Sequence, residues 1–177
     1  MSILKITKYT IFCVIFSVVL VFVIGLLLPE FKTIPVKNAT TADWSEKSFW
    51  AEPWGSSLTH KGIDIFAKKG TDLLATVDGF VLRTANWKKG GKIILILGPK
   101  WKIHYYAHLD SINVKKHQFV TSGQKIGTVG DSGNAKGKPP HLHYTISTIY
   151  PRPWAATNET HGSRKMFYLD PHIYLTE

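Results

Sequence analysis

The apolar residues of the chain form one long N-terminal run and many short runs farther along. Residues 11–28 carry no charge, follow Lys5 and Lys8, and precede Pro29 and Glu30. A run of this length is typical of a membrane-spanning helix. A cleaved signal peptide has a shorter apolar region with a small-residue cleavage site close behind it, so the pattern favours a retained signal anchor.

We therefore expect a single-pass protein of the cytoplasmic (inner) membrane, anchored through residues 9–28. The lysines before the anchor predict that residues 1–8 stay in the cytoplasm and that the remainder lies on the extracytoplasmic, periplasmic side. Residues 29–48 are mixed polar without a clear period, as in a tether between bilayer and domain. Residues 49–177 would then form one folded domain.

Beyond residue 50 the chain is a succession of short β-rich segments separated by glycines, which predicts an all-β domain. No run with a helical period of usable length follows the anchor. Residues 149–165, which include Pro151, Pro153 and Gly162, are expected to form a long loop. The expected strands are 63–66, 73–77, 80–84, 93–97, 103–107, 126–129 and 142–147.

Composition narrows the chemistry. The only cysteine, Cys13, lies in the anchor, so the domain can have neither a disulfide nor a thiolate metal ligand. The formal net charge is +10, which favours attraction to anionic polymers such as cell-wall glycopolymers or to lipid headgroups. The lysines form short scattered clusters without any nucleic-acid-binding motif, so we expect no nucleic-acid partner.

Histidine and carboxylate residues stand together in two segments. His60 and Asp64 are four residues apart, which puts them on one face of either a helix or a strand. In a strand, Gly62 would lie between them and leave space for an ion. His141 and His143 alternate with Leu142, so in a strand both imidazoles face one side and Leu142 faces the core. Taken singly, each segment also fits an exposed histidine or a carboxylate satisfied by a turn.

A third segment ends at His108, at the close of a strand-like run. The same alternation would put His104 on the face of His108, either beside the site or without a role. Together the three segments offer two histidines and one carboxylate for a metal, with further histidines nearby. Catalytic zinc sites have three protein ligands and keep a fourth position open for water, so this set favours a zinc enzyme.

These segments resemble the LytM or lysostaphin-type peptidases, the M23 family of peptidoglycan endopeptidases. The family's H-x-x-x-D, Y-x-H-L and H-x-H motifs match residues 60–64, 106–109 and 141–143 in the same order, and residues 120–127 match the hairpin before H-x-H. The resemblance covers most of the region beyond the anchor and implies an antiparallel β-sheet or sandwich.

The resemblance also implies that His60, Asp64 and His143 hold Zn²⁺. His108 and His141 would line the site without binding metal and act as catalytic groups, so that activated water hydrolyses peptide cross-links or stems of peptidoglycan. The chain departs from the family pattern upstream of His60. Members often have a tyrosine there, near the catalytic centre, where this chain has Trp54-Gly55.

Three other functions are weighed against the hydrolase. A catalytically silent module of the same fold could bind wall and activate other hydrolases, although it would have no reason to keep all five polar positions. The hairpin at 120–127 and the anchor suggest a carrier or efflux adaptor, for which the histidines have no use. Residues 130–133 contain Ser132 in a G-D-S-G string, which we interpret as turn residues rather than a serine-protease nucleophile.

Overall fold

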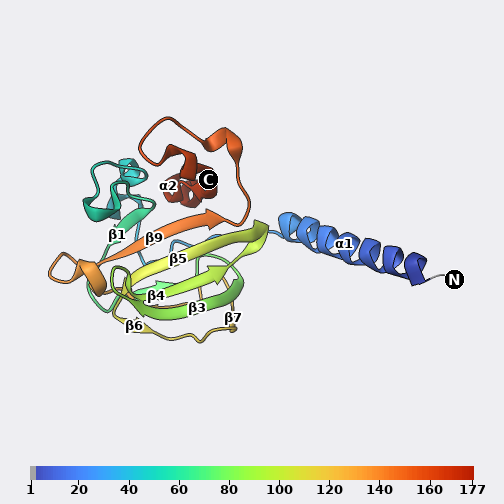
Figure 1. Cartoon of the computed structure of the whole chain (residues 1–177). Helices are drawn as coiled ribbons and strands as arrows, with labels where there is room; N and C mark the ends of the chain where they lie inside the picture. The colour runs from blue at the N-terminus through green and yellow to red at the C-terminus, as the bar shows by residue number, and fades with distance from the viewer. Residues whose placement is uncertain (1–2) are drawn as a thin grey trace.

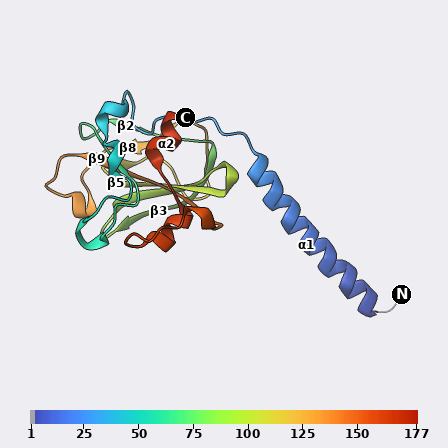
Figure 2. The ribbon, with the colours of Figure 1, turned by 90° about the horizontal axis from the view of Figure 1, so that it is seen from above.

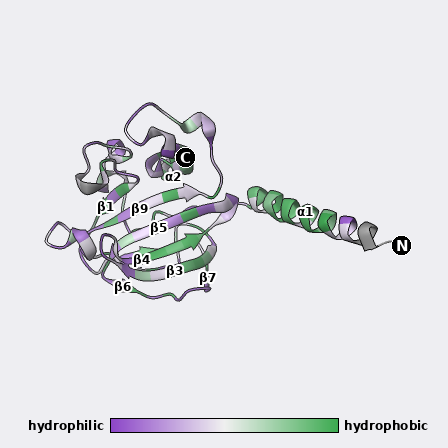
Figure 3. Cartoon of the chain, viewed as in Figure 1, coloured by the Kyte–Doolittle hydropathy of each residue, from purple (hydrophilic) through white to green (hydrophobic). Residues whose placement is uncertain are grey.

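A computed structural model describes residues 3–177 of the chain. Met1 and Ser2, which belong to the predicted cytoplasmic segment 1–8, lie outside the described residues. Helix α1 (Ile3–Leu27) projects from a β-rich domain (Figure 1). Within it, Thr7–Leu27 is long and apolar enough to cross a membrane. Figure 3 shows the apolar character running along nearly all of this helix, in agreement with the pattern of the sequence.

The domain is built from antiparallel strands in two sheets, as predicted (Figure 2). The larger sheet has the order β1-β9-β5-β4-β3-β7, with β10 also pairing with β9, and the smaller has the order β2-β8-β6. The strands are β1 (Ile63–Phe66), β2 (Asp72–Leu74), β3 (Gly79–Trp87), β4 (Gly91–Leu97), β5 (Lys102–Leu109), β6 (Ser111–Ile112), β7 (Phe119–Val120), β8 (Lys125–Thr128), β9 (His141–Thr148) and β10 (Tyr168–Leu169).

Several short elements were not predicted. Strands β6, β7 and β10 have two residues each, too few for a periodic signal. Strand β2 ends at Leu74, earlier than the expected 73–77, because Ala75 donates its N–H to Gln124 outside the strand ladder. A short helix, α2 (Pro171–Thr176), follows Asp170, whose side chain caps it by accepting from the His172 N–H.

The core lies between the two sheets and contains side chains of both, among them Leu73 and Ile126 from the smaller sheet and Ile94 and Tyr144 from the larger. Strand β9 shows how alternation sorts its residues. Its buried apolar residues, Leu142, Tyr144 and Ile146, belong to the core cluster. The histidines between and before them therefore lie on the opposite face of the larger sheet.

The segment 29–48, expected to be a tether, packs against the domain over much of its length. Val36 is only 1% exposed and forms a β-bridge with Leu73. Trp44 is also buried, and its indole N–H donates to Nδ1 of His172 at 3.2 Å. Backbone hydrogen bonds of Thr33, Pro35 and Lys37 with residues 72–76 add to these contacts. The segment has no alternating apolar pattern that would have predicted this pairing. Residues around Val36 and Trp44 are thus part of the folded core.

The predicted loop 149–165 contains the 3₁₀ turn η6 (Pro153–Ala155) and the start of a second 3₁₀ helix, η7 (Gly162–Phe167). It packs against the segment before β1. The Trp50 indole N–H donates to the carbonyl oxygen of Thr160 at 3.1 Å, and the Thr59 hydroxyl lies 3.3 Å from Nδ1 of His161. The loop therefore supports the chain that leads into the first of the histidine segments.

Candidate metal centre and cleft

A cleft of about 840 Å³ opens on the face of the larger sheet that points away from the core. Strands β1, β5 and β9 contribute to its floor, because β1 pairs with one edge of β9 and β5 pairs with the other. The cleft brings together all five residues singled out in the sequence: His60, Asp64, His108, His141 and His143. No residue of the loop 149–165 is among those that line it.

His60 lies just before β1, and Asp64 lies within β1 directly opposite His143 of β9. The sequence suggested that Gly62, between these two residues, leaves space for an ion, but the structure shows no such space there. A Cβ added at Gly62 would come within 2.2 Å of the Tyr144 carbonyl oxygen. Gly62 instead allows the backbone before β1 to approach β9 closely, which carries His60 over the end of the Asp64–His143 pair.

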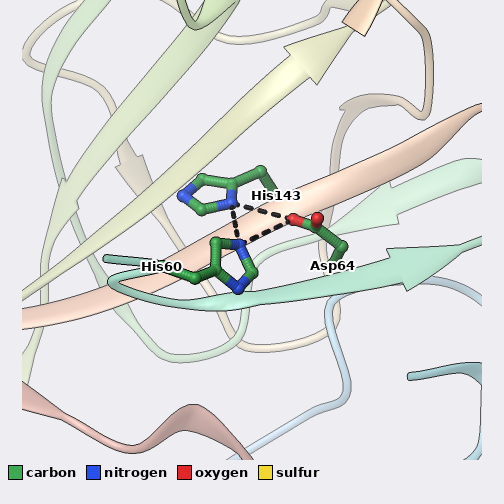
Figure 4. Close-up of side chains that lie close together, drawn as sticks. All are labelled: His60, Asp64 and His143. Atoms are coloured by element: carbon green, nitrogen blue, oxygen red, sulfur yellow. Dashed lines mark hydrogen bonds and ion pairs between the residues drawn. The ribbon is translucent and has the colours of Figure 1, made fainter. Parts of the chain in front are cut away.

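Three potential ligand atoms converge from these residues (Figure 4). Nε2 of His60 lies 3.1 Å from Oδ1 of Asp64 and 3.0 Å from Nδ1 of His143. Nδ1 of His143 lies 2.9 Å from the same Oδ1. In the described part of the chain, this is the one group of histidine, cysteine or acidic residues with the spacing of a metal site.

The hydrogen bonds on the outer side of each ring fix how the ring presents its lone pair. Nδ1 of His60 lies 2.9 Å from the Ser48 carbonyl oxygen, which can only accept, so this nitrogen carries the proton and Nε2 is a bare acceptor. Nε2 of His143 lies 3.1 Å from the Thr145 hydroxyl. When this hydroxyl accepts the His143 proton, three acceptors face one another, an arrangement that a cation would stabilise.

The charge states of the three residues suit a metal. Burial acts to raise the pKa of Asp64, but the close contacts of its carboxylate with His143 and His60 outweigh burial and hold that pKa far below its usual value. Burial lowers the pKa of His143 despite the opposing effect of Asp64. Neutral imidazole and ionised carboxylate are the forms that bind Zn²⁺, so the donor set of this site fits the ion that the sequence implies.

His108 and His141 lie beside this group with their rings 5.0 Å apart. Nδ1 of His108 donates to the Ser132 carbonyl oxygen at 2.9 Å, and Nδ1 of His141 donates to the Pro139 carbonyl oxygen at 2.8 Å. Each neutral ring therefore keeps an unprotonated Nε2. Burial, followed by the nearby His143, lowers the pKa of His108 to about 4, so at neutral pH this ring is a proton acceptor.

His104 does not share the face of His108, which corrects the alternation argument. His108 has a left-handed backbone with φ 66°, and the register of β4 against β5 shifts between Lys92 and Ile94. This irregularity turns His108 into the cleft. His104 is fully buried in the core instead, and its Nδ1 lies 2.7 Å from the Tyr144 hydroxyl. It takes no part in the site.

Several cleft residues were missed by sequence reasoning. Tyr105 lies edge-on to His143 and stacks on Trp87, with ring centroids 6.1 Å apart in each case. Ala107 pairs with His143, and Tyr105 lies two residues before Ala107 on the same face of β5. Period-two alternation along β5 could therefore have predicted Tyr105. Lys61 and Lys89 also line the cleft, but nothing in their local pattern distinguishes them from other surface lysines.

Trp54, the residue noted as a departure from the family pattern, stacks on the His60 imidazole with centroids 4.0 Å apart and planes 19° apart. An indole cannot ionise or donate as a phenol does, but its face covers the ring that holds one ligand atom. Trp54 also lines the cleft and is 39% exposed. It therefore covers one face of the His60 imidazole while exposing part of its own surface to the cleft.

Ser132 has the structural role expected of a turn residue. Its hydroxyl donates to the Leu109 carbonyl oxygen at 2.7 Å and accepts the Lys92 N–H, while its own carbonyl oxygen accepts from His108. The histidine therefore contacts the backbone of Ser132 and not its hydroxyl. This geometry gives no support to a serine nucleophile.

Sequence comparison finds relatives that share the histidine-bearing region. The chain is 40% identical over 112 residues to an L-Ala–D-Glu endopeptidase of Bacillus subtilis (strain 168), covering 58% of this chain and 34% of that protein. It is 36% identical over 109 residues to the murein hydrolase activator NlpD of Escherichia coli (strain K12), covering 60% of this chain and 28% of that protein. The chain thus spans about a third or less of the length of these relatives.

Solved structures with the same fold include peptidases. The catalytic domain of the antimicrobial peptidase lysostaphin from Staphylococcus simulans matches with a TM-score of 0.57 at 24% identity, over 84% of this chain and 93% of that one. A zinc-containing peptidase from Vibrio cholerae matches with a TM-score of 0.55 at 29% identity, over 67% of this chain and 36% of that one. At 24% identity, the match to lysostaphin supports the fold alone.

The sequence profile of Peptidase family M23 matches residues 58–156. This span is more than half of the chain and contains all five histidine and aspartate residues that meet in the cleft. Among the relatives of the chain are both endopeptidases and activators of hydrolases. On the agreement of profile, fold and residue order, the chain belongs to peptidase family M23.

Proposed function

We propose that the chain is a membrane-anchored zinc endopeptidase that hydrolyses peptide bonds in the cross-links or stems of peptidoglycan, on the outer side of the cytoplasmic membrane. The observation that carries this proposal is the convergence of His60, Asp64 and His143, with two further histidines beside them whose Nδ1 atoms are bonded to backbone carbonyls and whose Nε2 atoms are left to accept or deliver a proton. A structural metal site would have no need of the second pair.

His60 would bind through Nε2, His143 through Nδ1, and Asp64 through its carboxylate. When bound in such a site, Zn²⁺ polarises a carbonyl group and lowers the pKa of water. His108 is suited to accept a proton at Nε2, because its Nδ1 proton is held by the Ser132 carbonyl. His141, whose Nε2 lies 4.0 Å from Oδ2 of Asp64, would hold a proton at that nitrogen and deliver it to the leaving amine.

The cleft is lined by cations that suit an anionic peptide. Lys61, Lys89 and Lys138 all line it, whereas its one acidic residue, Asp64, faces the two ligand histidines. Burial, followed by Arg164 and Lys89, lowers the pKa of Lys61, which means that these cations repel one another. A substrate carboxylate would relieve that repulsion. Peptidoglycan stem peptides carry such carboxylates, so the charge of the cleft favours them over neutral peptides.

The test is digestion of purified peptidoglycan by the full chain in detergent, with mass analysis of the released fragments. Wild type should release peptide fragments and lose that activity under zinc chelation. His143→Ala should lose zinc and activity together. His108→Ala should keep its zinc and lose about 10²- to 10⁴-fold in rate. His117→Ala, at an exposed position outside the cleft, is the matched control and should behave as wild type.

The second candidate is a catalytically silent activator of other wall hydrolases, which the similarity to NlpD favours. The same digestion separates the two. An activator would release no fragments alone but would increase the rate of a separate hydrolase, and His108→Ala would leave that effect intact. Full cleavage by His108→Ala would instead contradict the role given to this residue.

A further inference from the structure

Helix α1 packs against the tip of the β4–β5 hairpin, the 3₁₀ turn η4 (Pro99–Trp101). The Trp101 indole N–H donates to the Phe22 carbonyl oxygen at 2.8 Å, and the two rings stack with centroids 6.0 Å apart. Tyr150 meets the same Phe22 ring edge-on at 5.8 Å. A Cβ added at Gly25 would lie 2.4 Å from the indole, so the ring touches the helix backbone directly.

A second contact fixes the chain just beyond the helix. The Glu30 carboxylate accepts hydrogen bonds from Lys102 Nζ at 2.7 and 2.9 Å and from the Tyr174 hydroxyl at 2.7 Å. Lys102 directly follows Trp101, while Tyr174 belongs to α2. The helix is therefore held at two points, one on its side and one beyond its end, which sets its direction relative to the domain.

The hairpin tip has an unusual backbone. Lys100 and Trp101 both have left-handed conformations, with φ 56° and 57°, which residues other than glycine and asparagine seldom adopt. Two such residues in succession are maintained only when surrounding contacts determine them. Here the Trp101 carbonyl oxygen accepts from the Ile149 N–H of the domain, while the indole bonds and stacks on Phe22 of α1. The strained tip thus serves to present the indole to the helix.

The depth of this contact along α1 corresponds to a membrane interface. Phe22 precedes the end of α1, at Leu27, by five residues, which is about 7–8 Å along a helix. If α1 spans a bilayer and ends at its surface, Trp101 and Tyr150 lie at the boundary of headgroups and acyl chains. Tryptophan and tyrosine are enriched at this level in membrane proteins, because they have an apolar body and a polar edge.

The neighbouring surface is apolar and open. Ile149 is 52% exposed. Together with Trp101 and residues 17, 18, 21 and 22 of α1 it lines a hollow of about 330 Å³ with almost no polar surface. Such a hollow is unfavourable in water and suits an acyl chain. It is continuous with the apolar surface of α1, which Figure 3 shows leading away from the domain.

Positive charge surrounds the same place. Both Lys100, at 3.6 Å, and Lys102, at 2.7 Å, pair with the single carboxylate of Glu30. Lys32 lies close by, with its ammonium donating to the Tyr174 carbonyl oxygen. One carboxylate therefore pairs with two ammonium groups, and a third ammonium group lies nearby. The surplus of positive charge next to an apolar hollow is complementary to lipids with anionic headgroups.

We propose that the surface formed by Lys100, Trp101, Ile149 and Tyr150, the juxtamembrane surface, lies in the headgroup layer of a bilayer containing anionic lipid. This inference rests on the proposed membrane span of α1. The domain then sits directly on the membrane in one orientation, and its cleft has a fixed height above the bilayer. Figures 1 and 2 both show α1 on one side of the domain and the turn η5 (Gly133–Ala135), beside the cleft, on the other.

Nitroxide labels on the full chain in phosphatidylglycerol-containing nanodiscs test the proposal. One label is placed on the native Cys13 as a reference for the inserted helix. In a Cys13→Ser background, Ile149→Cys carries the test label and Lys136→Cys, an exposed position just after η5, carries the matched control. Collision rates with oxygen, which partitions into lipid, and with a water-soluble nickel complex report the depth of each label.

We expect labels 13 and 149 to collide preferentially with oxygen and label 136 to collide preferentially with nickel, several-fold in each case. Trp101→Ala should shift label 149 towards water while leaving the zinc content unchanged, which shows that the domain is still folded. If label 13 is in lipid and label 149 is in water, the juxtamembrane surface is overturned while the membrane span of α1 still stands. A label at 13 in water would overturn the span and this proposal with it. Neither result depends on peptidoglycan cleavage, which is measured separately.

Discussion

The hydroxyl of Thr145 lies 3.1 Å from Nε2 of His143, while Nδ1 of the same ring faces Asp64 at 2.9 Å. The hydroxyl is thus placed to orient the imidazole and, in the form suited to a metal, to accept its proton at Nε2, away from the nitrogen that faces Asp64. We predict that Thr145→Val, which keeps the shape of the side chain, weakens zinc affinity about 10- to 100-fold. Competition with a fluorescent zinc chelator measures the change.

Thr148 provides a matched control, because it is another buried threonine of β9 but bonds the Tyr150 carbonyl oxygen at the far end of the strand. Thr148→Val should leave zinc affinity at the wild-type value. Equal zinc affinity in wild type and Thr145→Val would mean that the hydroxyl does not orient His143.

Gly62 is predicted to be intolerant of even the smallest side chain. A methyl group there would lie 2.2 Å from the Tyr144 carbonyl oxygen, so the segment before β1 would have to move away from β9. Gly62→Ala should lower the free energy of unfolding by about 1–3 kcal/mol, the usual range for overpacking. Zinc affinity should fall as well, since His60 moves with the segment. A variant with normal zinc affinity and stability would contradict the close approach.

The cationic lining of the cleft predicts a dependence on substrate charge. For stem peptides that carry free carboxylates, Lys61→Gln should raise KM several-fold and change kcat little. The reason is that Lys61 lines the cleft but is not one of the three residues proposed to hold the metal. Peptides whose carboxylates are amidated should show no such change. Steady-state kinetics with the two peptide sets provides the measurement, and an equal effect on both would argue for a structural role.

His104 predicts a component of the pH dependence of stability. Burial, followed by Lys102, lowers its pKa from 6.5 to about 3. The unfolded chain therefore binds this proton more readily than the folded chain between those pH values. The contribution of neutral His104 to the free energy of unfolding is fully present above pH 6.5. It is lost as the pH falls towards 3, by up to about 5 kcal/mol for a pKa shift of this size.

His104→Phe removes the titrating group while keeping a ring in the core. Denaturant unfolding of the zinc-free protein in detergent should show a smaller loss of stability between pH 6.5 and 4 than wild type, even though the variant loses the hydrogen bond to Tyr144 at all pH values. His117→Phe, at an exposed position, should follow the wild-type curve. Parallel curves for His104→Phe and wild type would contradict the assigned shift.

Alternation along β9 predicted that His141 and His143 share a face, whereas the set of His60, Asp64 and His143 was expected from the family resemblance. The register that places Asp64 opposite His143 is visible only in the structure. His108 could not be placed this way. Its left-handed backbone and the shifted pairing of β4 with β5 reverse the alternation that would have put it with His104. Local sequence carries little information about such an irregularity, since it arises from pairing between strands.

The packing of the N-terminal segment was unpredictable for a different reason. Val36 and Trp44 enter the core from a stretch whose regular structure is limited to a β-bridge and two 3₁₀ turns, Thr41–Asp43 and Glu46–Ser48, and they contact Leu73 and His172. Their burial depends on a surface that the rest of the domain creates, so no pattern within residues 29–48 indicates it. The strands of the sheets, in contrast, carry their burial pattern in their own alternation.

The packing of Val36 and Trp44 bears on how the domain could be shed from its anchor. A protease that cut just before Glu30 would leave both core residues and the Ser48 carbonyl that holds His60 in place. It would release the folded domain from α1 with its cleft intact. A cut after Trp44 would remove both core side chains and open the smaller sheet at Leu73. Along this short stretch, the position of a single cleavage decides between liberating the folded domain and destroying it.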